Sequence, residues 1–85
     1  MAVWPDWHRT VDERILRYFE ANPPDYVPLM ANRLNVHLEY AERRVELLVE
    51  HDLLRPVTNE RIYTVTDRGR RMVEAADEAA VPTED

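Results

Sequence analysis

Arginines near the middle of the chain are the residues whose type and spacing best fit binding chemistry. All 11 basic side chains are arginine, and an amphipathic helix pattern over residues 38–51 places several polar side chains on its outer side. Arginine can donate two parallel hydrogen bonds to a guanine edge, and Asn and His are also competent donors to bases. Tyrosine can reach a phosphate. The outward residues of this helix and of the turn before it are expected to be Asn35, His37, Glu39, Tyr40, Arg43 and Arg44.

These outward residues have two interpretations that the sequence leaves open. They could contact DNA in the major groove, where Glu39 could accept a hydrogen bond from cytosine. They could instead form a solvated face whose internal pairs, such as Glu39–Arg43 at an i,i+4 spacing, stabilise the helix. We expect DNA contact for Arg43 and Arg44, and we expect that replacing both with alanine abolishes binding without affecting the fold.

A second group of arginines follows the helix. Arg55 and Arg61 lie on either side of a turn with Asn59 at its tip, and such a ribbon could follow a minor groove or the phosphates. The alternative is a plain surface hairpin. Arg68 begins an arginine-rich helix start, where cations oppose the helix dipole. That unfavourable placement suggests phosphate contact or pairing with acids across an interface.

Catalytic and metal-binding motifs are not evident. The chain has no cysteine, serine or glycine-rich loop, so nucleophilic catalysis and phosphate-loop chemistry have no candidate residues. His8, His37 and His51 are too scattered for a metal motif. We therefore expect a protein that is not an enzyme and that uses neither a cofactor nor a metal.

The elements that position these residues follow from hydrophobic spacing and breakers. Residues 1–9 are expected to form an arm held extended by Pro5, and a capping box at Thr10 and Glu13 is expected to begin the first helix. Asn35 can take the left-handed conformation needed for a tight turn. The expected elements are a helix from 10 to about 22, a helix over 28–34, a helix over 38–51, strands over 54–57 and 62–65, a helix over 66–80 and an acidic tail over 81–85. Leu29, Leu34 and Leu38 are among the residues expected to be buried.

This order of elements predicts a mainly α fold with a small β-hairpin, arranged α-α-α-β-β-α as a winged helix-turn-helix. Two segments carry a family resemblance. Residues 40–48 followed by Asp52-Leu53-Leu54 are similar to the recognition helix and wing entry of MarR/ArsR/PadR-type regulators, and residues 63–70 are similar to their strand-to-helix junction. Many of these relatives have glycine where Asp52 stands, and aspartate tolerates a left-handed turn less well. The turn is therefore expected to differ here.

The resemblance implies transcriptional regulation and commonly a homodimer, which we expect to form through the first and last helices. The whole chain most resembles small phage-repressor-like winged-helix proteins of halophilic archaea. The composition agrees: the net charge is −6, lysine is absent, and the acidic residues gather towards the C-terminal end. A GC-rich genome is the alternative explanation for the preference for arginine.

The charge also separates two function hypotheses. The first is a dimeric repressor that binds double-stranded DNA. The second is a winged-helix interaction module that docks a basic protein partner and does not bind DNA, which the acidic balance favours because non-specific DNA affinity arises from cations. Neither a secretory signal nor a membrane span is visible, so a cytoplasmic location is expected.

Overall fold

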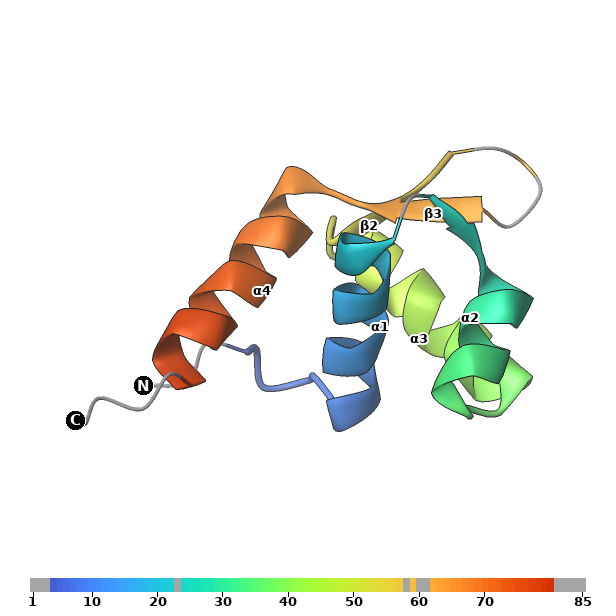
Figure 1. Ribbon diagram of the computed structural model, residues 1–85, viewed down its shortest axis with the longest axis horizontal. Helices are drawn as coiled ribbons and strands as arrows, with labels where there is room; N and C mark the ends of the chain where they lie inside the picture. Colours follow the sequence, from blue (N-terminus) through green and yellow to red (C-terminus); the bar gives the residue numbers. More distant parts are fainter. Residues whose placement is uncertain (1–3, 23, 58, 60–61, 81–85) are drawn as a thin grey trace.

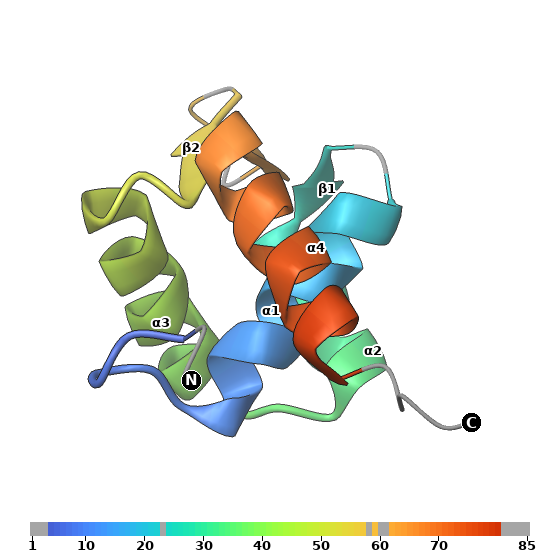
Figure 2. The same ribbon diagram turned by 90° about the vertical axis from the view of Figure 1, so that its left-hand side faces the viewer.

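The chain folds around α1 (Thr10–Ala21), a helix with apolar residues on much of its surface. The computed structural model describes residues 4–22, 24–57, 59 and 62–80. Helix α1 contacts α2 (Val27–Leu34), α3 (Leu38–Glu50), β3 (Ile62–Val65) and α4 (Asp67–Ala80). Figure 1 shows it in the middle of the molecule, with α4 on one side and α2 and α3 on the other, and Figure 2 shows the same arrangement from the side of α4. Ile15, Leu16 and Phe19 are almost fully buried, so α1 supplies the centre of the core.

The start of α1 differs from the expected capping box by one residue. The cap is Arg9, and the carboxylate that accepts a hydrogen bond from its backbone amide belongs to Asp12, at 2.8 Å. The prediction that Thr10 and Glu13 form the box is therefore wrong. The helix ends at Ala21 with Asn22 as its C-cap, as the following prolines predicted.

Helices α2 and α3 are joined by the tight turn that the sequence predicted. Asn35 has φ 59° and ψ 45°, and the amide of Val36 donates to the carbonyl of Ala31 at 2.9 Å. Val36 packs partly against the core beneath the turn. Two expected core residues are more exposed than predicted: Leu29 is 38% exposed and Leu38 is 40% exposed. The buried side of α3 consists of Ala41, Val45 and Leu48.

The β ribbon is part of a three-stranded antiparallel sheet with the order β1-β3-β2. The hairpin of β2 (Leu54–Pro56) and β3 was predicted, and Pro56 lies on an edge strand as its missing amide hydrogen requires. Strand β1 (Asp25–Tyr26) was not predicted, because two residues carry no periodic pattern. It pairs Asp25 with Tyr63 and Tyr26 with Ile62, and so ties the α1–α2 connection to the hairpin.

Helix α4 begins at the strand-to-helix junction and packs on α1. Thr66 caps it, because its Oγ1 accepts a hydrogen bond from the Gly69 amide at 3.0 Å and donates one to the Asp52 carbonyl at 2.7 Å. Val73 and Ala76 are buried, and Arg17 of α1 binds Asp77. With 14 residues, α4 is the longest helix in the described part of the chain, and none of the described helices has the apolar length needed to cross a membrane.

A hydrogen bond between Tyr18 and Asp25 links the core to β1 and gives a pH-dependent prediction. The Tyr18 hydroxyl donates to Asp25 Oδ2 at 2.5 Å, and burial, followed by this bond, raises the pKa of Tyr18 above its ordinary value. The folded state therefore favours the protonated phenol. The contribution of the protonated Tyr18 to the free energy of unfolding is fully present below the unfolded pKa of about 10. It is lost as the pH rises through the folded pKa.

We expect Tyr18→Phe to lower the free energy of unfolding by about 1 kcal/mol at neutral pH, because one hydrogen bond is lost. We also expect it to weaken the decline in stability above roughly pH 10. Thermal unfolding at several pH values, followed by circular dichroism, measures both effects. An equally steep alkaline decline in the variant would show that Tyr18 does not cause it.

The turn between α3 and β2 keeps Asp52 in the left-handed region, with φ 61°. A non-glycine residue in this conformation costs roughly 1–2 kcal/mol of folding free energy. Glycine avoids that cost, but part of the gain is lost because glycine raises the conformational entropy of the unfolded chain. We expect Asp52→Gly to stabilise the domain by about 0.5–1 kcal/mol in urea unfolding. Asp52→Ala is the matched control, since it removes the same carboxylate without relieving the backbone. Equal stabilisation by both variants would assign the effect to charge.

Candidate nucleic-acid interface

The outer side of α3 and the turn before it form the first part of the candidate interface. Five of the six residues expected to face outward there are exposed: Asn35, His37, Glu39, Tyr40 and Arg43. The left-handed turn at Asn35 directs α3 away from α2, and the buried stripe of α3 holds the helix against α1. These five residues therefore lie along the turn and the first half of α3, as predicted.

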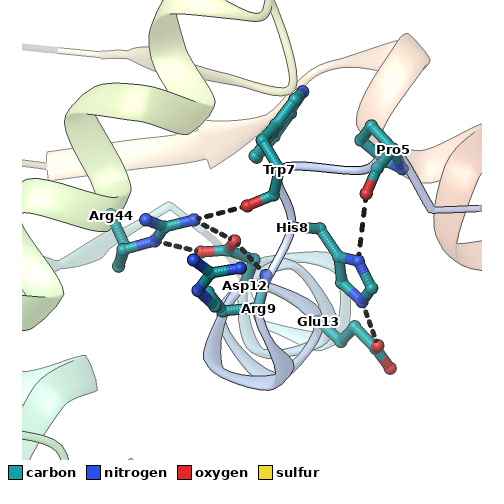
Figure 3. Close-up of polar contacts among 7 residues, drawn as sticks. All are labelled: Pro5, Trp7, His8, Arg9, Asp12, Glu13 and Arg44. Carbon is teal, nitrogen blue, oxygen red and sulfur yellow. Dashed lines mark hydrogen bonds and ion pairs between the residues drawn. The ribbon is translucent and has the colours of Figure 1, made fainter.

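Arg44, the sixth residue, does not face outward. Its Nε donates to Asp12 Oδ1 at 2.9 Å and its Nη2 donates to Asp12 Oδ2 at 2.6 Å, which is the two-pronged geometry of a strong ion pair (Figure 3). A further bond runs from Nη2 to the Trp7 carbonyl at 3.3 Å. The hydrogen bond to Asp12 raises the pKa of Arg44, which keeps it charged. The prediction of an outward Arg44 is thus wrong.

Asp12 explains why Arg44 turns inward. Its side chain is 1% exposed, on the same stripe of α1 as the buried Leu16 and Phe19. A buried carboxylate needs a charged partner. Arg44 lies beside Val45 and one turn from Leu48 on the stripe of α3 that faces α1. An acid on one buried stripe and a base on the other was the sequence signal that could have predicted this pair.

With Arg44 turned inward, acids dominate the outer side of α3. Glu39, Glu42, Arg43 and Glu46 line a shallow hollow of about 440 Å³, and Glu50 is exposed at the end of the helix. Such a face repels phosphates at low salt. At 1 M salt the Debye length is only about 3 Å, so repulsion beyond direct contact is largely screened. Any contact of this face with DNA is therefore expected to depend on salt.

The N-terminal arm is folded onto the domain. Trp7 stacks on His51 at the end of α3 with ring centroids 4.2 Å apart, and Trp4 stacks on His8 at 5.3 Å. The His8 ring contacts the Pro5 carbonyl at 3.1 Å and Glu13 at 2.7 Å (Figure 3). Pro5 does not hold the arm extended, because the His8 amide donates to its carbonyl and closes a turn. Because the Trp7 carbonyl accepts a hydrogen bond from Arg44, the folded arm helps to position that arginine.

The wing, which is the hairpin of β2 and β3, forms the second part of the candidate interface together with the first turn of α4. Arg55 is exposed on the edge strand β2, and Arg68 is exposed in the first turn of α4. Both line one open hollow, so the structure brings these two predicted residues together. Asn59 is exposed in the connection between the strands. Arg61 lies outside the described residues. Within the described ranges, no group of three or more acidic or histidine side chains could hold a metal ion.

Comparison with solved structures identifies the fold. A MarR/EmrR family transcriptional regulator from Acinetobacter sp. ADP1 superposes with a TM-score of 0.78 at 18% identity, over 86% of this chain. Another MarR family transcription regulator gives 0.77 at 23% identity over 87%, and Staphylococcus aureus MarR, solved with salicylate and kanamycin, gives 0.69 at 18% over 92%. The fold is a MarR-type winged helix.

The likeness is structural only. No family model matches the sequence, and no curated protein matches it. The winged-helix chain spans 53%, 54% and 62% of those three regulators. The predicted fold class is confirmed with one addition, the strand β1.

Proposed function

We propose that this chain is a sequence-specific DNA-binding transcriptional regulator that acts as a dimeric repressor. The observation that carries the proposal is the exposed first half of α3, presented beside a wing by a left-handed turn at Asn35. In helix-turn-helix proteins the second helix enters the major groove with its N-terminal residues against the bases. The structural likeness to MarR family regulators supports the same use of α3 here.

The proposed contacts divide between α3 and the wing. On α3, Arg43 would read guanine, while Asn35, His37, Glu39 and Tyr40 would contact adjacent bases or phosphates. On the wing side, Arg55, Arg61 and Arg68 would contact the sugar-phosphate backbone. Arg44 is left out of this set, since its guanidinium is committed to Asp12. Its role is to fix the position of α3 on α1.

Dimerisation through α1 and α4 is part of the same proposal. These two helices pack on each other within one chain, and their remaining exposed surfaces are charged, as at Arg14 and Glu74. A symmetric dimer would read two half-sites about one helical turn apart. The composition is in line with a cytoplasmic protein of a halophilic archaeon, where salt would screen the acidic surface of α3.

Arg43→Ala tests the α3 contact. We expect it to weaken binding to a selected duplex about tenfold, because a good contact between arginine and guanine contributes roughly 1–3 kcal/mol. The duplex would come from a selection on genomic fragments at molar salt, and fluorescence anisotropy would measure the affinity. Arg9→Ala is the control, since it removes one exposed arginine that is not among the proposed contacts. Equal affinities of both variants and the parent would rule out the assigned role.

The alternative function, docking of a basic protein partner, is favoured by one observation, the glutamates around Arg43. Under that alternative no duplex would be retained at any salt concentration. An arginine-rich peptide would bind instead, and Arg43→Ala would strengthen that binding by removing a like charge. The two functions therefore predict opposite effects of the same substitution.

A further inference from the structure

An arginine-lined hollow lies where the first turn of α4 meets the outer side of the β2–β3 ribbon. Its charged lining consists of Arg55, Arg68, Arg70 and Arg71 together with Asp52 and Asp67, and its volume is about 480 Å³. This site, called the arginine hollow below, shares no lining residue with the acidic hollow on α3. Strand β2 and α4 are adjacent here because β2 pairs with β3, which leads into α4 through Thr66.

The charges of the arginine hollow are not balanced within the described part of the chain. Arg70 pairs with Asp67 at 3.2 Å, but both side chains are largely exposed. Arg55, Arg68 and Arg71 have no ion pair with any described residue. Three of the four arginines also lie at the N-terminal end of α4, where the helix dipole disfavours cations. The hollow thus holds four arginines against two aspartates, and three of the arginines lie where the helix dipole disfavours a cation.

The chemistry of the lining selects the class of ligand. Guanidinium groups bind phosphate through paired hydrogen bonds, and a helix N-terminus adds amides and a positive partial charge. The amide of Gly69 is already bound to Thr66, whereas those of Asp67 and Arg68 precede the first intrahelical bond. The volume falls in the range of small-molecule sites, roughly 300–1,000 Å³, and the polar lining disfavours an apolar ligand.

We propose that the arginine hollow is a binding site for a phosphate group. The group has two possible sources, a free phosphorylated metabolite and the backbone of bound DNA. For the DNA backbone, the inference rests on the proposed function, in which Arg55 and Arg68 already contact it. For a free phosphate compound it goes beyond that function, since such a compound can probe the hollow whether or not α3 binds DNA. Its arginines come from two elements, so neither the ribbon nor the helix forms the site alone.

The test uses pyrophosphate as the free probe and a duplex as the second probe. Titration of the isotope-labelled full chain with pyrophosphate, at constant ionic strength, is followed by the amide resonances of residues 66–71. We expect saturable shifts there and an affinity about tenfold weaker in Arg55→Ala/Arg71→Ala, because charge-assisted bonds are lost. Arg9→Ala/Arg17→Ala removes the same charge elsewhere and is expected to bind as the parent does. Circular dichroism verifies that both variants are folded.

The two probes separate the sources of phosphate. Saturable pyrophosphate binding that requires Arg55 and Arg71 supports a free ligand. A duplex affinity that falls in Arg55→Ala/Arg71→Ala but not in the control supports the DNA backbone. If neither probe distinguishes the two double variants, the proposal is overturned. If the duplex affinity depends on the arginine hollow but not on Arg43, only the proposed role of α3 is contradicted. The proposal for the arginine hollow would stand.

Discussion

Arg44→Ala is expected to destabilise the fold by about 3–5 kcal/mol, because it leaves a buried carboxylate without its partner. Asp12 is 1% exposed and accepts two hydrogen bonds from Arg44. Domains are typically stable by only about 5–15 kcal/mol, and a small one is at the lower end. A large fraction of Arg44→Ala is therefore expected to be unfolded at moderate temperature, as urea unfolding followed by circular dichroism would measure.

Two further variants decide whether the buried charge is the cause. Asp12→Leu/Arg44→Leu removes both charges and should recover much of the lost stability, since apolar replacement of a buried pair is often neutral or stabilising. Arg43→Ala, one residue away and exposed, should change stability by less than about 0.5 kcal/mol. If Arg44→Ala and Arg43→Ala were equally stable, the pair would have no structural role.

The ion pair between Asp12 and Arg44 also changes how DNA binding has to be tested. The sequence alone led to the expectation that Arg43→Ala/Arg44→Ala would abolish binding and leave the fold intact. Because Arg44 supports the packing of α3 on α1, loss of binding by that double variant would not separate contact from folding. The single substitution of Arg43 is the informative one.

Gly69→Ala is expected to cost about 3 kcal/mol, although alanine normally stabilises a helix relative to glycine by about 1 kcal/mol. A Cβ at this position would lie 2.3 Å from the Leu53 carbonyl oxygen and 2.7 Å from Cγ2 of Val65. The Leu53 oxygen cannot easily move, since it accepts a hydrogen bond from the Thr66 amide at 3.1 Å. The first turn of α4 would have to move away from the wing.

The sign of the change makes this prediction decisive. Thermal unfolding should give a lower midpoint for Gly69→Ala, whereas helix propensity alone predicts a higher one. Glu74→Ala, at an exposed position on the same helix, is the control and should be close to neutral. A raised midpoint for Gly69→Ala would mean that the junction can open without cost.

Local signals predicted most of the elements. Asn35 predicted the left-handed turn, the prolines after Asn22 predicted the end of α1, and Thr66-Asp67 predicted the start of α4. Each signal depends on residues within about one helical turn, so it can be read from the sequence. Strand β1 carries no such signal, since its formation depends on pairing with Tyr63, far along the chain.

The candidate site was predicted less completely than the fold. The exposed residues of α3 follow from helical spacing, which is a local property. Leu29 and Leu38 were expected in the core, yet they are partly exposed, since periodicity cannot tell how wide a face its neighbours cover. The arginine hollow was also not evident, although Arg68 at a helix start hinted at an anion, because Arg55 reaches it only through the pairing of β2 with β3.

The sequence by itself determined the order of the helices and the hairpin, the tight turn before α3 and the arginine-only basic set. Only the tertiary structure decided which arginines are free to bind a ligand. Arg43 and Arg44 are neighbours of the same type, and both were expected on the outer side of the helix. Asp12, 32 residues away on α1, binds one of them and leaves the other exposed. The physical reason is that a buried charge must be paired, and its partner is chosen by packing across the core.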